Sequence, residues 1–229
     1  MQPCCVLVYL TTTEKDFKII IMSSISPDKI SLVKKFYYLD KMCMREISER
    51  LGVSIHAVVH FMRKYDLPRR SYKEMNRLRF ERKSPSFKWR KHLSRDAEAL
   101  KLAGAMLYWG EGYKSEKGSV LDFTNSDPVM IKIFLNFMHS VFELDESKFR
   151  VLLYCYADQN TSELIKFWSD LSGIGRKQFI KPYVRKDFRK DGRKMHYGMV
   201  HIRYIDKKLL LAIKELIEHY KIKFAQVDP

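Results

Sequence analysis

The sequence lacks several features that are typical of common protein classes. No apolar run reaches the roughly 18 residues of a membrane-spanning helix, so no membrane partner is expected. The four cysteines form no Cys-x-x-Cys pair and have no histidine cluster beside them, which argues against zinc and favours reduced thiols in the cytoplasm. No glycine-rich phosphate loop and no readable Ser/Cys–His triad is present, which argues against a metabolic enzyme.

Acidic residues are far fewer than basic ones. The 229 residues include 43 Lys and Arg against 27 Asp and Glu, a formal net charge of +16. Such an excess favours a polyanionic partner, because each phosphate that is neutralised releases condensed counterions. Nucleic acid is therefore the first candidate, and a basic protein without such a partner is the alternative. The length allows one large domain or two small ones.

Residues 26–70 predict a small, all-helical domain that follows an N-terminal extension of uncertain role at residues 1–25. Ile47 and Leu51 lie on one face of a helix, and Gly52 follows where that helix should end. Ser54 is placed to cap a second helix that carries Val58 and Met62. A helix, a glycine-containing turn and a capped helix form the helix-turn-helix layout. A plain helical hairpin is the alternative.

This segment resembles the small helix-turn-helix domains of resolvases and related DNA-binding proteins. The resemblance implies that residues 54–64 form the recognition helix. Four of its residues would then face the major groove: Ser54, Ile55, His56 and His60.

Residues 71–95 predict a basic linker. The segment is rich in Lys and Arg, carries interleaved aromatic residues, and contains a Ser-Pro-Ser break. Together with Arg69 and Arg70 just before it, this stretch would follow phosphates between two DNA-contacting domains. A solvated charge run is the alternative.

Residues 96–223 predict an α+β domain with an antiparallel sheet. Helical patterns at 96–109, from 128, at 161–173 and at 207–220 alternate with strand patterns at 119–125, 149–157 and 197–205. Within the first helix, the stretch LAGAMLYWGEGYK (102–114) is apolar and then ends on a carboxylate between two glycines. By itself, this ending would suit any exposed helix C-terminus.

In the context of that order of elements, residues 104–112 resemble the signature helix of the LAGLIDADG homing endonucleases. The acidic eighth letter of the motif falls on Glu111. The resemblance covers residues 97–220 and implies a saddle-shaped antiparallel sheet on DNA. It also implies two signature helices packed side by side, one from each subunit of a homodimer. The residues of that interface would be Ala103, Gly104, Met106, Leu107 and Gly110.

The same resemblance assigns the remaining candidate site residues. Glu111 from each subunit would bind Mg²⁺ or another divalent cation and carry the cleavage chemistry. Gln178 and Lys181 would assist by positioning water or neutralising charge. Further DNA contacts would come from Lys114, Lys117, Arg150, Lys177, Arg185 and Lys186.

Three functions stay open on the sequence. The first is a divalent-metal-dependent, site-specific DNA endonuclease acting as a homodimer. The second is a non-catalytic, sequence-specific DNA-binding regulator with a degenerate domain of this kind, which the Glu in place of the more usual Asp favours. The third is an RNA-binding, splicing-assisting protein, against which the helix-turn-helix pattern argues. The first two predict a cytoplasmic, nucleoid-associated protein on double-stranded DNA.

Overall fold

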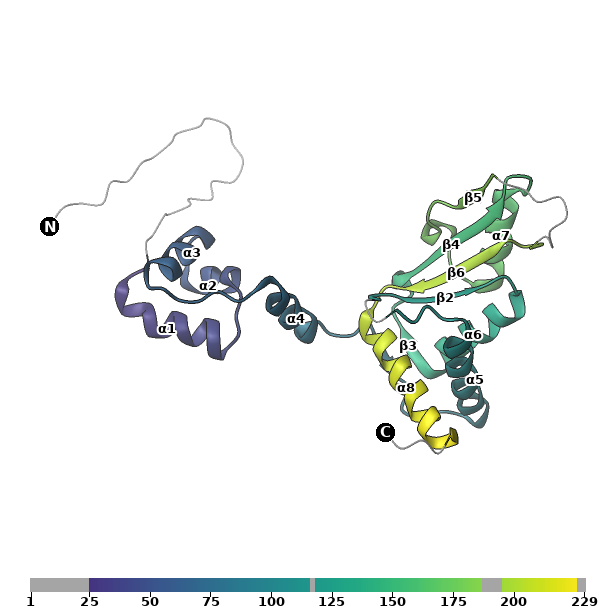
Figure 1. Ribbon diagram of the computed structural model, residues 1–229, viewed down its shortest axis with the longest axis horizontal. Coiled ribbons are helices and arrows are strands. Elements are labelled where there is room, and N and C mark those ends of the chain that lie inside the picture. The colour runs from purple at the N-terminus through teal and green to yellow at the C-terminus, as the bar shows by residue number, and fades with distance from the viewer. Residues whose placement is uncertain (1–24, 116–117, 187–194, 226–229) are drawn as a thin grey trace. The chain divides into compact units, whose positions relative to one another are not determined.

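The computed structural model describes residues 25–115, 118–186 and 195–225. The chain divides into two compact units, with the boundary between Lys83 and Ser84. Helices make up the first unit, and the second mixes helices with strands (Figure 1). Of the helices within these ranges, none combines the length and the apolar character that crossing a membrane requires.

The first unit is built on three consecutive helical segments. Ser54 begins the third of them by accepting a hydrogen bond from the Ala57 N–H at 3.1 Å. The core forms where Val33, Ile47 and Val58 from the three segments meet, all fully buried. The described elements are η1 (Pro27–Lys29), α1 (Ile30–Lys34) continued by η2 (Lys35–Leu39), α2 (Met44–Leu51), α3 (Ile55–Lys64) and α4 (Tyr72–Arg82).

The second unit alternates helices and strands, as the α+β prediction requires. Its long first helix ends at Glu111, two residues beyond the end expected from the pattern. The elements are β1 (Phe87–Trp89), α5 (Arg95–Glu111), β2 (Leu121–Asn125), α6 (Pro128–Val141), β3 (Phe142–Leu144), η3 (Glu146–Lys148), β4 (Phe149–Tyr156), α7 (Thr161–Ser172), η4 (Arg176–Gln178), β5 (Tyr183–Arg185), β6 (Met199–Tyr204) and α8 (Lys207–Ala225).

The main sheet has the strand order β2-β6-β4-β5. The pairs β2–β6 and β4–β6 are antiparallel, but β4 and β5 run parallel. The prediction of a wholly antiparallel sheet is therefore wrong at this edge. The physical reason is that α7 separates β4 from β5, and a helical crossover returns the chain in the same direction. A small second sheet pairs β1 with β3 in antiparallel fashion.

The two faces of the main sheet differ in burial. Along β4, Phe149, Val151, Leu153 and Cys155 are buried, and the residues between them are partly exposed. Figure 1 shows α5, α6 and α8 gathered on one side of the strands. The buried face packs with these helices into one core, in which Phe123 stacks on Phe134 with ring centroids 4.1 Å apart. The other face is called the open face below.

The segment predicted as a linker, residues 71–95, is structured. Ser71 caps α4 by accepting from the Glu74 N–H at 3.2 Å, and Arg82 donates to both carboxylate oxygens of Glu46 at 3.0 and 3.1 Å. Residues from Ser84 onward belong to the second unit, where Ser86 donates to the Asp206 carboxylate at 2.7 Å. The high content of charged residues led the sequence analysis to miss two elements, α4 and β1. The pattern Ser71-x-x-Glu74 is nevertheless a helix-start pattern that indicates α4.

Candidate nucleic-acid interface

Helix α3 presents the predicted contact residues of the first unit on its exposed side. Ile55, His56 and His60 are exposed, whereas Val58 and Met62 on the opposite side are fully buried. Arg63 extends the exposed face by one more turn. The Ser54 hydroxyl already accepts from the Ala57 N–H, so its side chain has a capping role at the start of the helix. The result is a polar helix face with imidazole and guanidinium donors.

The two arginines that follow α3 have different surroundings. Arg69 is exposed. The Arg70 guanidinium donates to the backbone carbonyls of Tyr37 at 2.5 Å, Met42 at 2.6 Å and Lys41 at 3.1 Å, and it lies 3.9 Å from the centroid of the Tyr37 ring. Arg70 therefore ties the chain after α3 to the first helical segment, and only Arg69 keeps the surroundings expected of a phosphate contact.

In the second unit, Glu111 is the last residue of α5 and is exposed. Gly112 forms an antiparallel bridge with Phe123, and the Tyr113 N–H donates to the Asp122 carbonyl at 2.9 Å. Because antiparallel partners run in opposite directions, residue 111 lies beside Thr124 at the β2 edge of the sheet. The fold thus brings the C-terminal end of α5 to the rim of the open face.

Charged side chains form a row across three strands of the open face. Asp122 pairs in register with Arg203, which pairs with Arg150. The Arg203 Nε donates to Asp122 at 2.8 Å, and His201 Nδ1 lies 3.0 Å from the same carboxylate. Burial opposes ionisation of Asp122, but the hydrogen bonds and charges of His201 and Arg203 outweigh it and hold the pKa of the carboxyl below its usual value. The row keeps a surplus of positive charge.

Two of the residues predicted to contact DNA, Lys114 and Arg150, donate hydrogen bonds to backbone carbonyls of their own unit. The Lys114 ammonium donates to the carbonyls of Trp109 and Gly110, at 2.6 and 3.3 Å, and so caps the C-terminus of α5 next to Glu111. Arg150 donates to the carbonyls of Ser147 and Phe149. Lys177, Arg185 and Lys186 are exposed, and Lys117 lies outside the described residues.

Gln178 and Lys181 lie on the opposite edge of the sheet from Glu111. One row of paired residues runs from Gly112 through Phe123, Ile202 and Val151 to Phe179. At about 4.8 Å between neighbouring strands, the two ends of this row are roughly 19 Å apart. The Gln178 amide donates to the backbone carbonyls of Glu146 and Phe149 at 2.7 and 3.0 Å. Within one chain the structure does not bring Gln178 or Lys181 to the Glu111 carboxylate.

The residues predicted for the helix-pair interface fall on two sides of α5. A Cβ built on Gly104 would lie 2.0 Å from the Phe137 ring, so this glycine allows the close approach of α5 and α6 in the same chain. Met106 and Leu107 are half-buried and pack against the core of their own unit. Ala103 and Gly110 are exposed, together with Ala99 one turn earlier. The surface available to a second copy is thus the face of Ala99, Ala103 and Gly110, on which the half-buried Met106 also lies by the helix period.

The comparisons with known proteins give no further assignment. No family model, no curated protein and no solved structure matches the chain.

Proposed function

We propose that the chain binds double-stranded DNA, with α3 in the major groove and the open face of the sheet as a second contact surface. The observation that carries the proposal is the exposed face of α3, where Ile55, His56 and His60 point away from a well-packed core. Side chains near the start of a capped helix are the ones that reach base edges in this mode of binding. The net charge of +16 supplies the attraction to phosphate.

Fluorescence anisotropy at several salt concentrations tests DNA binding. A duplex selected from a random-sequence pool should bind, and replacing His56 and His60 by Ala should remove most of its advantage over unrelated duplexes. Each lost base contact should lower affinity by about 5- to 100-fold. The control is His219→Ala, an exposed histidine on α8, which should bind as the parent does. A double variant that keeps the parent's preference for the selected duplex would contradict the assignment to α3.

The more specific function is cleavage of that DNA by a homodimer. Glu111 fits one half of a divalent-cation site, because its exposed carboxylate makes no hydrogen bond or ion pair among the described residues. It also lies at a helix C-terminus, where partial negative charge favours a cation. Within the described ranges no three His, Cys, Asp or Glu side chains gather to form a metal site, so the described residues of one chain supply only this half.

Glu111 and the partner's Glu111 would hold Mg²⁺ between them if the exposed face of α5 packs on a second copy. A bound divalent cation activates water and stabilises the charge that develops on the phosphodiester. The role of the chain itself is to hold the carboxylate at the rim of the open face, with the Lys114 ammonium beside it on the last turn of α5. Ala103 and Gly110 would let the two helix backbones approach closely.

Incubation of supercoiled plasmid carrying the selected site with protein and Mg²⁺ tests this step. The parent should linearise or nick the plasmid, and Glu111→Gln should abolish the reaction while DNA binding is retained. Glu98→Gln, at an exposed carboxylate in the first turn of the same helix, should cleave normally. Cleavage that survives Glu111→Gln would eliminate the mechanism.

The second candidate is a regulator that binds the same DNA without cutting it. The observation that favours it is the ion pairing of Asp122, an acidic residue of the open face whose carbonyl accepts from the Tyr113 N–H just after α5. That carboxylate is already paired with Arg203, so it is not available to hold a cation together with Glu111. Sedimentation with and without DNA separates the candidates, because a monomer in both states leaves each Glu111 without a partner. Measuring affinity for a folded RNA at the same salt tests the RNA-binding alternative.

A further inference from the structure

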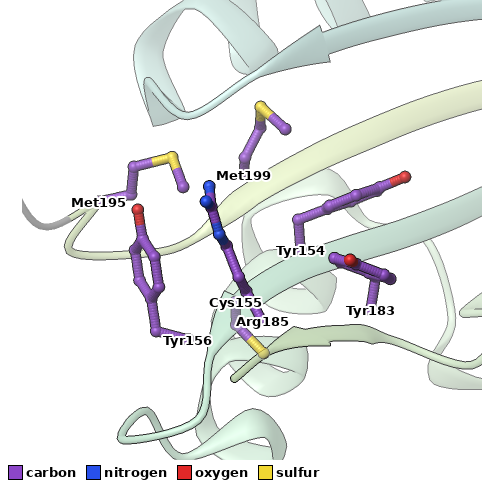
Figure 2. Close-up of a pocket in the computed structure, with 7 residues that line it drawn as sticks. All are labelled: Tyr154, Cys155, Tyr156, Tyr183, Arg185, Met195 and Met199. Atoms are coloured by element: carbon purple, nitrogen blue, oxygen red, sulfur yellow. The ribbon is translucent and has the colours of Figure 1, made fainter. Parts of the chain in front are cut away.

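The open face of the main sheet has a pocket at the end farthest from the charged row. Its volume is about 370 Å³, which is in the range of small-molecule sites. Figure 2 shows Tyr156 on one side, Tyr154 and Tyr183 on the other, and the Arg185 side chain between them. The lining residues are Tyr154, Cys155, Tyr156, Tyr183, Arg185, Met195 and Met199.

The strand register explains why these side chains meet. Tyr154 on β4 pairs with Tyr183 on the parallel strand β5 and with Met199 on β6, and Tyr156 pairs with Arg185. Side chains at paired positions lie on the same face of a sheet. The residues therefore project side by side from three neighbouring strands. The parallel edge strand, which the sequence pattern did not predict, supplies one wall.

The chain segment before β6 is held against the pocket. Gln159 accepts from the Tyr156 N–H at 2.9 Å and donates to the Met195 carbonyl at 2.8 Å. Gly198 has φ +65°, and a Cβ there would lie 2.5 Å from the Tyr154 carbonyl, so only glycine lets the turn approach β4 so closely. These contacts fix the position of Met195 at the rim of the pocket.

The chemistry of the lining suits a flat, polar aromatic ring. The Tyr154 ring lies 4.9 Å from both Tyr183 and His201, which makes a ladder of three rings across β6, β4 and β5. Thioethers such as Met199 adapt their shape and contact ring edges favourably. An arginine donates to ring nitrogens and carbonyl oxygens, as it does to guanine. The seven lining residues include no carboxylate, so negative charge is not repelled there.

We propose that this pocket receives a single unpaired nucleobase of the bound DNA, stacked on the tyrosines with its acceptor edge toward Arg185. The proposal rests on the proposed DNA-binding function, since it is the duplex on the open face that would present the base. Tyr183, which is 56% exposed, leaves the pocket open toward that surface. Aromatic platforms of this kind bind bases with little sequence preference, and a base that is already unpaired avoids the cost of unstacking.

Three duplexes of one sequence test the proposal by anisotropy: fully paired, with a bulged 2-aminopurine, and with a bulged abasic residue. We expect the base-containing bulge to bind about tenfold more tightly than the other two. The fluorescence of the 2-aminopurine should fall on binding, because stacking on tyrosine quenches it. Tyr183→Leu should remove both the preference and the quenching. The matched control is Phe224→Leu, an exposed aromatic residue on α8, which should keep both.

The outcomes separate the pocket from DNA binding itself. Tight binding of the paired duplex with equal affinity for all three would overturn the pocket and leave the proposed function standing. A bulge preference that persists with the abasic residue, or in Tyr183→Leu, would also overturn it, because backbone flexibility would then be the cause. Failure to bind any of the three duplexes would overturn both proposals.

Discussion

The two units hold their candidate contacts in different ways. In the first, Ile55, His56 and His60 come from two turns of one helix, so the helix period alone places them together. In the second, Glu111 and Gln178 were expected to act together but lie beyond opposite edges of the sheet. The comparison teaches that a site on one helix follows from local sequence, whereas a site on a sheet depends on strand order. Three substitutions sharpen this contrast.

The largest effect is expected from Gly104→Ala in α5. The added methyl would lie 2.0 to 2.5 Å from atoms of the fully buried Phe137, so α5 and α6 would have to move apart. We expect a loss of about 3 kcal/mol in the free energy of unfolding of the second unit. Tryptophan fluorescence during urea unfolding reports this directly, because Trp89, Trp109 and Trp168 all lie in that unit.

Gly110→Ala is the matched control for this prediction. A Cβ at Gly110 meets nothing within 4 Å. Alanine should therefore raise stability by up to about 1 kcal/mol through helix propensity. Equal effects of the two substitutions would show that α5 does not pack on α6 through Gly104.

A smaller effect is expected from Arg70→Ala in the first unit. The substitution removes hydrogen bonds from a charged donor to three carbonyls. The free energy of unfolding of the first unit should therefore fall by about 2 kcal/mol. Hydrogen exchange of the α1 and α3 amides, read by mass spectrometry, measures this loss. Arg69→Ala should leave hydrogen exchange unchanged. It should instead reduce the slope of log affinity for DNA against log salt concentration by about 1, which corresponds to one lost phosphate contact. The contrast fails if both variants exchange alike.

The smallest effect concerns the pH dependence of the second unit. Because the pKa of Asp122 is lowered in the folded state, its contribution is fully present above the ordinary value of 3.8 and is lost as the pH falls through the lower, folded value. Asp122→Asn should cost about 1 kcal/mol at neutral pH and flatten the acid limb of the stability curve below that value. Glu143→Gln, at an exposed carboxylate on β3, should leave that limb as it is. An unchanged acid limb in Asp122→Asn would argue against the pairing with Arg203.

Several cations of the chain have hydrogen-bond partners that the sequence does not indicate. Arg70 was predicted to contact DNA from its place beside a basic segment, and Lys114 from the family resemblance. Each of them also donates to backbone carbonyls nearby in its own unit. Arg82 likewise pairs with Glu46, 36 residues earlier. Sequence gives the charge of a side chain but not the acceptors that lie within its reach. Which cations are available to a ligand therefore depends on packing.

The sequence by itself determined the local elements: the capped α3 with one buried and one exposed face, the helix α5 to within two residues of its end, and the alternation of helices and strands. Capping, periodicity and charge act over a few residues, so they can be read in order along the chain. The tertiary structure alone decided that β5 runs parallel to β4, that Gly104 faces Phe137, and that a tyrosine-lined pocket forms on the open face. These features arise between residues far apart in the chain, where pairing and close packing, rather than local pattern, select the neighbours.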